Sequence, residues 1–147
     1  MEKLNFSKYP IQLKSNENRT TVLDLIRKKH LVLTPEEWVR QHVLHFLITD
    51  MRYPKSLINV EKQIELNGTK KRYDIVVYRN DGSIFLIVEC KAPKIKINQT
   101  AFDQIARYNL ELNGQFLMVT NGLEHYYAII DYNNQCYHFL KELPEYK

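Results

Sequence analysis

Three stretches with the pattern of extended strands occupy the middle of the chain, at residues 60–66, 72–79 and 84–91. The dipeptides Asn67-Gly68 and Asp81-Gly82 separate them, and such dipeptides favour tight turns between antiparallel strands. The second and third stretches are apolar at successive positions, so both of their faces are suited to burial. The pattern therefore predicts two consecutive hairpins whose last two strands are central in a sheet with helices on both sides.

Helical patterns precede these strands. Residues 22–29 favour a short helix, and a second helix is predicted after Thr34, because threonine is a good N-cap and Pro35 suits the first turn. This helix should end before Tyr53-Pro54, since the residue preceding a proline avoids helical torsions. Its core-facing positions are Trp38, Val39, Val43, Phe46 and Leu47.

A third helix is predicted over residues 99–113, with Gly114 as its C-terminal stop. Further strands are predicted at residues 116–120, 126–132 and 136–140. The fold class is therefore α/β: a helix, three antiparallel strands, a helix and further strands, in a central mixed β-sheet flanked by helices on both faces. We expect residues 1–33 to form an N-terminal arm with the short helix, packed on a domain of residues 34–147.

Length and composition limit the functional classes. At 147 residues with 44% hydrophobic content, the chain can bury one core without disulfides. Cys90 and Cys136 lie in apolar segments, which favours a reduced, cytoplasmic protein. No stretch reaches the roughly 18 apolar residues of a membrane span, and no glycine-rich phosphate motif occurs, so we expect neither membrane insertion nor an ATP site. The five histidines show no zinc-ligand spacing with the cysteines.

The charge pattern favours a polyanionic partner. The formal net charge is +4 and the isoelectric point is about 9.0. Basic residues gather in the sequence around the second and third strands, and of these Lys94 and Arg107 are the strongest candidates to neutralise backbone phosphates of a nucleic acid. The other basic residues there are equally compatible with a solvated surface.

The hairpin brings charged residues together. If the Asp81-Gly82 turn is tight and centred between these two residues, Asp74 faces Glu89, Arg72 faces Lys91, and Tyr78 faces Phe85. Two directly opposed carboxylates repel one another across a strand pair. A divalent cation would compensate, and Mg²⁺ prefers such oxygen ligands. Lys91 projects from the same face as Glu89, where an ammonium can orient a water or neutralise charge on a phosphate.

Five blocks of sequence carry a resemblance to a known family: PEEWVRQ, RYDIVVY, VECKAP, FDQIARYN and VTNG. In this order and spacing, they resemble the N-terminal nuclease domain of type I restriction enzyme R subunits, within the PD-(D/E)XK nuclease superfamily, over residues 34–127. The resemblance implies a restriction-endonuclease-like fold and a Mg²⁺ cofactor, with Mn²⁺ as a substitute. Tyr73 replaces the proline of the superfamily pattern, which we expect to be harmless in a strand.

The resemblance also implies roles for individual residues. Asp74 and Glu89 would be metal ligands, the backbone carbonyl of Cys90 a third ligand, and Lys91 the catalytic lysine. Gln104 and Tyr108 would match the Q-x-x-x-Y element beside the site, with Gln104 in a catalytic role and Tyr108 in nucleic-acid binding. The motor segment that follows this domain in R subunits does not occur before Lys147, so we expect no translocation-coupled cleavage by this chain alone.

Two assignments have a structural alternative. Glu37 corresponds to the acidic residue that such nucleases carry on the first core helix, but Thr34 to Glu37 also fits a capping box in which the glutamate bonds back to the N-cap amide. Gln104 and Tyr108 share one helical face, which points either to the site or to an ordinary polar margin of an amphipathic helix.

The favoured hypothesis is a Mg²⁺-dependent deoxyribonuclease that hydrolyses DNA phosphodiester bonds. A double-strand break would need two copies, so a homodimer is expected. One alternative is a non-catalytic nucleic-acid-binding module that retains the nuclease fold. Another is an unrelated α/β protein whose hairpin charges are incidental; Asp74→Ala would then relieve repulsion and leave nucleic-acid affinity unchanged.

Overall fold

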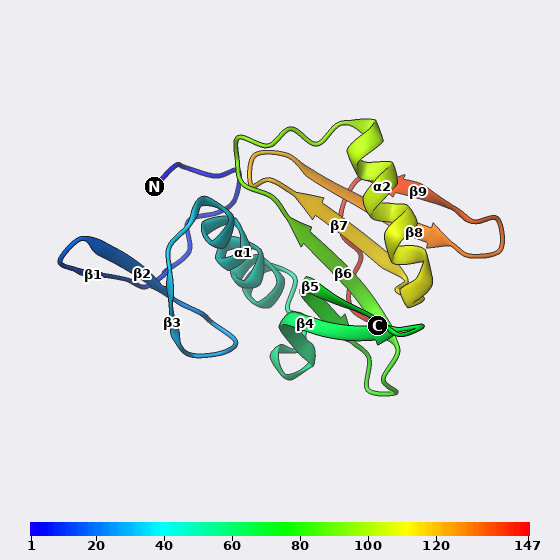
Figure 1. Ribbon diagram of the computed structural model, residues 1–147, viewed down its shortest axis with the longest axis horizontal. Helices are drawn as coiled ribbons and strands as arrows, with labels where there is room; N and C mark the ends of the chain where they lie inside the picture. The colour runs from blue at the N-terminus through cyan, green and yellow to red at the C-terminus, as the bar shows by residue number, and fades with distance from the viewer.

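One mixed sheet of six strands forms the centre of the molecule, in the order β4-β5-β6-β7-β8-β9 (Figure 1). The computed structural model describes residues 1–147, apart from the side chain of Leu66. Neighbouring strands are antiparallel except β6 and β7, which run parallel and are joined by a crossover that contains α2. The strands are β4 (Ile58–Leu66), β5 (Thr69–Tyr78), β6 (Ile84–Cys90), β7 (Phe116–Thr120), β8 (His125–Asp131) and β9 (Cys136–Leu140).

Helices pack on both faces of this sheet, as the apolar pattern predicts. α1 (Pro35–His45) continues into one π-helical segment, Phe46–Asp50, and packs Val39, Val43 and Leu47 onto one face. α2 (Gln99–Asn109) is followed by a short 3₁₀ segment, Leu110–Leu112, and packs on the opposite face. Thr34 caps α1 by accepting the amide of Glu37 at 3.0 Å, so the predicted N-cap is confirmed.

The predicted helix over residues 22–29 is wrong. The N-terminal region instead forms a three-stranded antiparallel sheet of β1 (Leu13–Asn16), β2 (Arg19–Leu23) and β3 (His30–Val32). Thr20, Thr21 and Val22 are β-branched and favour a strand. A turn then follows because the carboxylate of Asp24 accepts the amides of Ile26 and Arg27.

The predicted register of the β5–β6 hairpin is correct only in its centre. Val76 pairs with Ile87 as expected, but a bulge follows, and Tyr78 pairs with Ile84 rather than with Phe85. The turn is longer than a two-residue turn, because the amide of Arg79 bonds to the carbonyl of Ser83. At the other end, the last pair of the ladder is Ile75 with Val88.

The predicted pairs Asp74–Glu89 and Arg72–Lys91 both lie beyond this ladder.

No helix in the described chain is both long and apolar enough to cross a membrane.

Candidate functional site

The candidate site lies where β5 separates from its neighbours. Between β4 and β5 the register passes from Val60–Ile75 to Lys62–Tyr73 without pairing Glu61 with Asp74. Asp74 also lies one residue beyond the last β5–β6 pair. The chain at Asp74 is therefore interrupted on both sides, and this frees its carboxylate to lie between the strands.

Asp74 takes part in two contacts across this gap. Its Oδ2 accepts the backbone amide of Cys90 at 2.8 Å, and its Oδ1 lies 3.6 Å from the guanidinium of Arg40 on α1. The side chain of Arg40 is only 6% exposed. Asp74 is thereby held between the end of β6 and the helix that covers one sheet face.

Glu89 and Lys91 complete the predicted set. Lys91 Nζ lies 3.4 Å from Glu89 Oε1, and both side chains are partly buried. The amide of Lys91 bonds to the carbonyl of Thr120 on β7, which fixes the backbone where β6 ends. Asp74, Glu89, Cys90 and Lys91 therefore gather at one end of the central strands, although the two acids are not a paired cross-strand position.

The electrostatics of the site are dominated by burial of negative charge. Burial raises the pKa of Asp74, while the Cys90 amide and Arg40 partly oppose the rise. Burial, followed by the charge of Asp74, raises the pKa of Glu89 to about 7. The site therefore holds two carboxyls whose negative charge is incompletely compensated by the cations of the chain.

The first turn of α1 carries two neighbouring acids, Glu36 and Glu37. Glu37 is buried, accepts Gln41 Nε2 at 3.0 Å and lies 3.4 Å from Arg40. Burial raises the pKa of both Asp74 and Glu89, and the charge of Glu36 adds to both rises. The contacts of Glu37 with Arg40 and Gln41 direct its carboxylate towards its own helix, and metal binding by Glu37 stays a prediction.

Arg40 is the centre of an ionic network that the sequence analysis missed. Besides Asp74, it contacts Glu61 at 2.8 Å, and Glu61 contacts Arg27 at 3.2 Å. Arg27 in turn pairs with the fully buried Asp24 at 2.9 Å. The pair of Asp24 with Arg27 is local, but Arg27, Glu61 and Arg40 come from the β2–β3 turn, β4 and α1, and only the fold brings these three together.

Glu61 adopts a left-handed backbone conformation, with φ of 50°. Such torsions are unfavourable for a residue with a side chain and persist where the surroundings hold them. The two arginines that bind its carboxylate provide that constraint. The interruption of the β4–β5 ladder at Asp74 thus coincides with a strained residue on the neighbouring strand.

Gln104 and Tyr108 of α2 line one pocket with Glu89. This pocket has a volume of about 230 Å³, and its other lining residues are Arg72, Tyr73, Ile105 and Asn109. Tyr108 is exposed, and the Lys71 ammonium lies over its ring. This pocket is a polar recess beside Glu89, on the face covered by α2.

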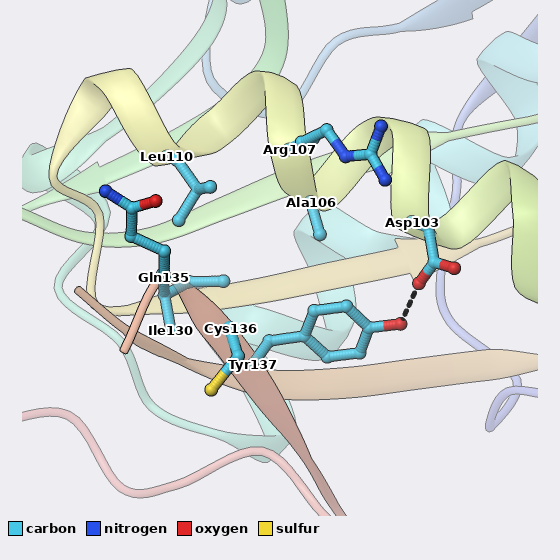
Figure 2. A pocket seen from close by; sticks show the side chains of 8 residues that line it. All are labelled: Asp103, Ala106, Arg107, Leu110, Ile130, Gln135, Cys136 and Tyr137. Atoms are coloured by element: carbon cyan, nitrogen blue, oxygen red, sulfur yellow. Dashed lines mark hydrogen bonds between the residues drawn. The ribbon is translucent and has the colours of Figure 1, made fainter. Parts of the chain in front are cut away.

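Neither of the two predicted phosphate contacts lines this recess. Lys94 is exposed in the segment between β6 and α2. Arg107 lies on the side of α2 that faces β8 and β9, and lines a separate pocket with Asp103 and Tyr137 (Figure 2). Nucleic-acid binding by these two residues stays a prediction.

Residues 35–144 match the family model described as the type I restriction enzyme R protein N terminus. Comparison with curated proteins gives no match. The matched region contains both helices, all six strands of the central sheet and every residue of the candidate site.

Proposed function

Because the chain belongs to the family of type I restriction enzyme R protein N termini, we propose that it is a metal-dependent endonuclease domain of the PD-(D/E)XK type that hydrolyses DNA phosphodiester bonds. One observation carries the proposal: Asp74, Glu89 and Lys91 gather at the end of two central strands, with both carboxyls partly buried and their pKa values raised. The six-stranded sheet between α1 and α2 is compatible with a restriction-endonuclease-like fold.

The residues present fit a hard divalent cation. Burial and the charge of Asp74 raise the pKa of Glu89 to about 7, and Lys91 opposes this rise only in part. A bound cation would therefore stabilise the ionised carboxylates of Asp74 and Glu89. Carboxylate oxygens are the ligands that Mg²⁺ prefers, and Asp74, Glu89 and the Cys90 carbonyl would hold it. Mg²⁺, or Mn²⁺ in its place, would supply Lewis-acid polarisation of the phosphate and activation of a water.

The protein groups then have separate roles. Lys91, held beside Glu89, orients the attacking water or neutralises charge that develops on the phosphate. Gln104 reaches the same recess from α2 and positions the water or the phosphate. Tyr108 and Lys71 present an aromatic ring and a cation that bind the nucleic-acid backbone beside this recess. Lys94 contributes a further phosphate contact outside the recess.

A plasmid-nicking assay with Mg²⁺ tests the proposal. Wild type should nick supercoiled DNA, while Asp74→Asn and Lys91→Ala should be at least about 100-fold slower, because each removes a group that acts on the reacting atoms. Asp81→Asn and Lys62→Ala are matched controls, since both residues are exposed and lie outside the site. Nicking that is undiminished in Asp74→Asn and Lys91→Ala contradicts the mechanism.

Binding measured on the same proteins separates the second function, a non-catalytic nucleic-acid-binding module. For an endonuclease, Asp74→Asn should retain DNA affinity while it loses cleavage. For a binding module, wild type binds DNA with a steep salt dependence, loses affinity in Lys94→Ala and does not cleave. One active site cuts one strand, so a rate of double-strand breakage that rises with protein concentration more steeply than nicking supports the expected homodimer.

A further inference from the structure

A second group of potential metal ligands lies at the far corner of the central sheet. Asp131 at the end of β8 is paired directly with Cys136 at the start of β9, and His138 follows two residues later on the same face. His138 Nε2 lies 3.9 Å from Cys136 Sγ and 3.8 Å from Asp131 Oδ2. Among the described residues, these three form the group whose ligand atoms all lie within 4.8 Å of one another.

The spacing is close to that of a tetrahedral zinc site. With Zn–S bonds of about 2.3 Å and Zn–N or Zn–O bonds of about 2.0 Å, neighbouring ligand atoms lie roughly 3.3–3.6 Å apart. The observed separations of 3.8 and 3.9 Å therefore need a contraction of only a few tenths of an ångström. His138 is mostly exposed, so its side chain is free to make this adjustment.

The carboxylate is already oriented. The amide of Asn134 donates to Asp131 Oδ1 at 3.1 Å, and the side-chain amide of Asn134 donates to Oδ2 at 2.9 Å. These two bonds hold the Asp131 carboxylate in a fixed orientation. Such outer contacts fix the direction of a metal ligand and raise metal affinity.

We propose that Asp131, Cys136 and His138 form a zinc-binding site that closes the β8–β9 hairpin, with a water as the fourth ligand. Thiolate and imidazole select Zn²⁺ over Mg²⁺, which prefers oxygen ligands alone. The site joins the edge strand β9 to β8 at the hairpin end, where β9 has no further strand beside it. Bound Zn²⁺ therefore stabilises this edge of the sheet.

This site is separate from the candidate nuclease site. β7 and β8 lie between β6 and β9 in the sheet. Glu89 pairs with Val119 near the carboxyl end of β7, whereas Ile129, two residues before Asp131, pairs with Phe116 at the beginning of β7. The hairpin and the carboxyl end of β6 lie at opposite ends of the sheet (Figure 1). Figure 2 shows that the Cys136 sulfur turns away from α2, while Tyr137 turns towards Asp103.

Titration of the reduced, metal-free full chain with Zn²⁺ and Co²⁺ tests the site. Wild type should bind Zn²⁺ in the presence of excess Mg²⁺, its thermal midpoint should rise, and Co²⁺ should give thiolate-to-metal charge-transfer absorption. Cys136→Ser and His138→Gln should bind at least about 100-fold more weakly, and Asn134→Ala about 10-fold more weakly. His30→Gln is the matched control, because His30 is an exposed strand histidine in β3.

Several outcomes would overturn the proposal. They are failure of wild type to bind one equivalent of Zn²⁺ at this site, Zn²⁺ affinities of Cys136→Ser and His138→Gln equal to that of His30→Gln, or charge-transfer absorption that persists in Cys136→Ser. Cys90 cannot substitute as the thiolate without unfolding, because it is only 1% exposed. The same titration on Asp74→Asn should be unchanged, which keeps this result independent of the nuclease site.

Discussion

Glu89 shows how burial sets the charge state of a single side chain. Burial and the neighbouring Asp74 raise its pKa to about 7, from an ordinary value of 4.5. An acid whose pKa is raised by folding destabilises the fold when it is ionised. Glu89 therefore lowers the stability of the metal-free protein progressively as pH rises from about 4.5 to about 7, and fully above that range.

Replacement of Glu89 by glutamine should remove this dependence. From pH 5 to pH 8, the free energy of unfolding of wild type should fall by about 2–3 kcal/mol relative to that of Glu89→Gln. Urea denaturation at both pH values, in the presence of a chelator, measures the difference. Glu65→Gln, at an exposed position of β4, should follow wild type. Parallel pH profiles for wild type and Glu89→Gln would contradict the assigned burial.

Arg40 compensates negative charge, whereas Glu89 adds it, because its guanidinium contacts several acids at once. Arg40→Ala leaves Asp74, Glu37 and Glu61 without their shared cation, and loss of a buried ionic partner typically destabilises by about 3–5 kcal/mol. Urea denaturation should show a loss of this size. Arg107→Ala, at an exposed position of α2, is the control and should change stability by about 0.5 kcal/mol or less. Equal losses of unfolding free energy in the two variants would mean that Arg40 does not stabilise the fold through these acids.

Among the elements, the turn between β7 and β8 joins two segments that are distant in the sequence, the N-terminal segment and the chain after β6. Asn121 accepts the amides of Leu123 and Glu124 and donates to the carbonyl of Ile95 at 2.8 Å. The carbonyl of Gly122 accepts the amide of Asn5 at 2.8 Å. This turn therefore holds the N-terminal segment and the chain after β6 together, next to the end of the strand that carries Glu89.

Gly122→Ala should destabilise the protein more than Gly68→Ala. Both glycines have a positive φ, of 87° and 77°, so both substitutions carry the backbone penalty of a left-handed residue. A Cβ at Gly122 would lie 2.9 Å from Leu4 and 3.0 Å from Val39, whereas a Cβ at Gly68 meets nothing within 4 Å. We expect an additional loss of about 1–3 kcal/mol at Gly122, measured by thermal denaturation. Equal losses of stability in the two variants would show that Leu4 and Val39 shift to accommodate the added Cβ.

At the scale of the whole molecule, the N-terminal sheet is connected to the site although the family match begins at residue 35. The connection passes from Asp24 through Arg27 and Glu61 to Arg40, with each neighbouring pair within 3.2 Å. Asp24 also accepts Gln41 Nε2 of α1 at 3.1 Å. The N-terminal segment is therefore part of the framework that holds Asp74.

Arg27→Ala tests this connection. It leaves the buried Asp24 without its charged partner and removes one of the two cations at Glu61, so stability should fall by about 1–3 kcal/mol. Amide hydrogen exchange should accelerate in β2 and at the start of α1, and DNA nicking should slow. Arg19→Ala, in the neighbouring strand β2, is matched in residue type, but Arg19 is exposed, and this variant should resemble wild type. Unchanged amide exchange in α1 would mean that the N-terminal segment does not stabilise the helix that carries Arg40.

The sequence by itself determined the elements whose causes are local. The predicted helices at residues 35–52 and 99–113 and the six central strands follow from apolar periodicity, an N-cap threonine and turn dipeptides, and the structure confirms them within a few residues. The same local spacing placed Glu89 and Lys91 on one face of β6. Residues 22–29 were misassigned because Asp24 forms a turn there, and neither its buried position nor its partners are visible in the sequence.

The tertiary structure alone decided how the acids are held. The contact of Asp74 with Cys90 and the contacts of Arg40 with Glu61 and Asp74 all join residues that are distant in the chain. The Asp131, Cys136 and His138 group likewise arises only once the hairpin pairs β8 with β9. Hydrophobic periodicity and turn preference act between near neighbours, whereas charge compensation and ligand convergence act through space, and so they require the folded chain.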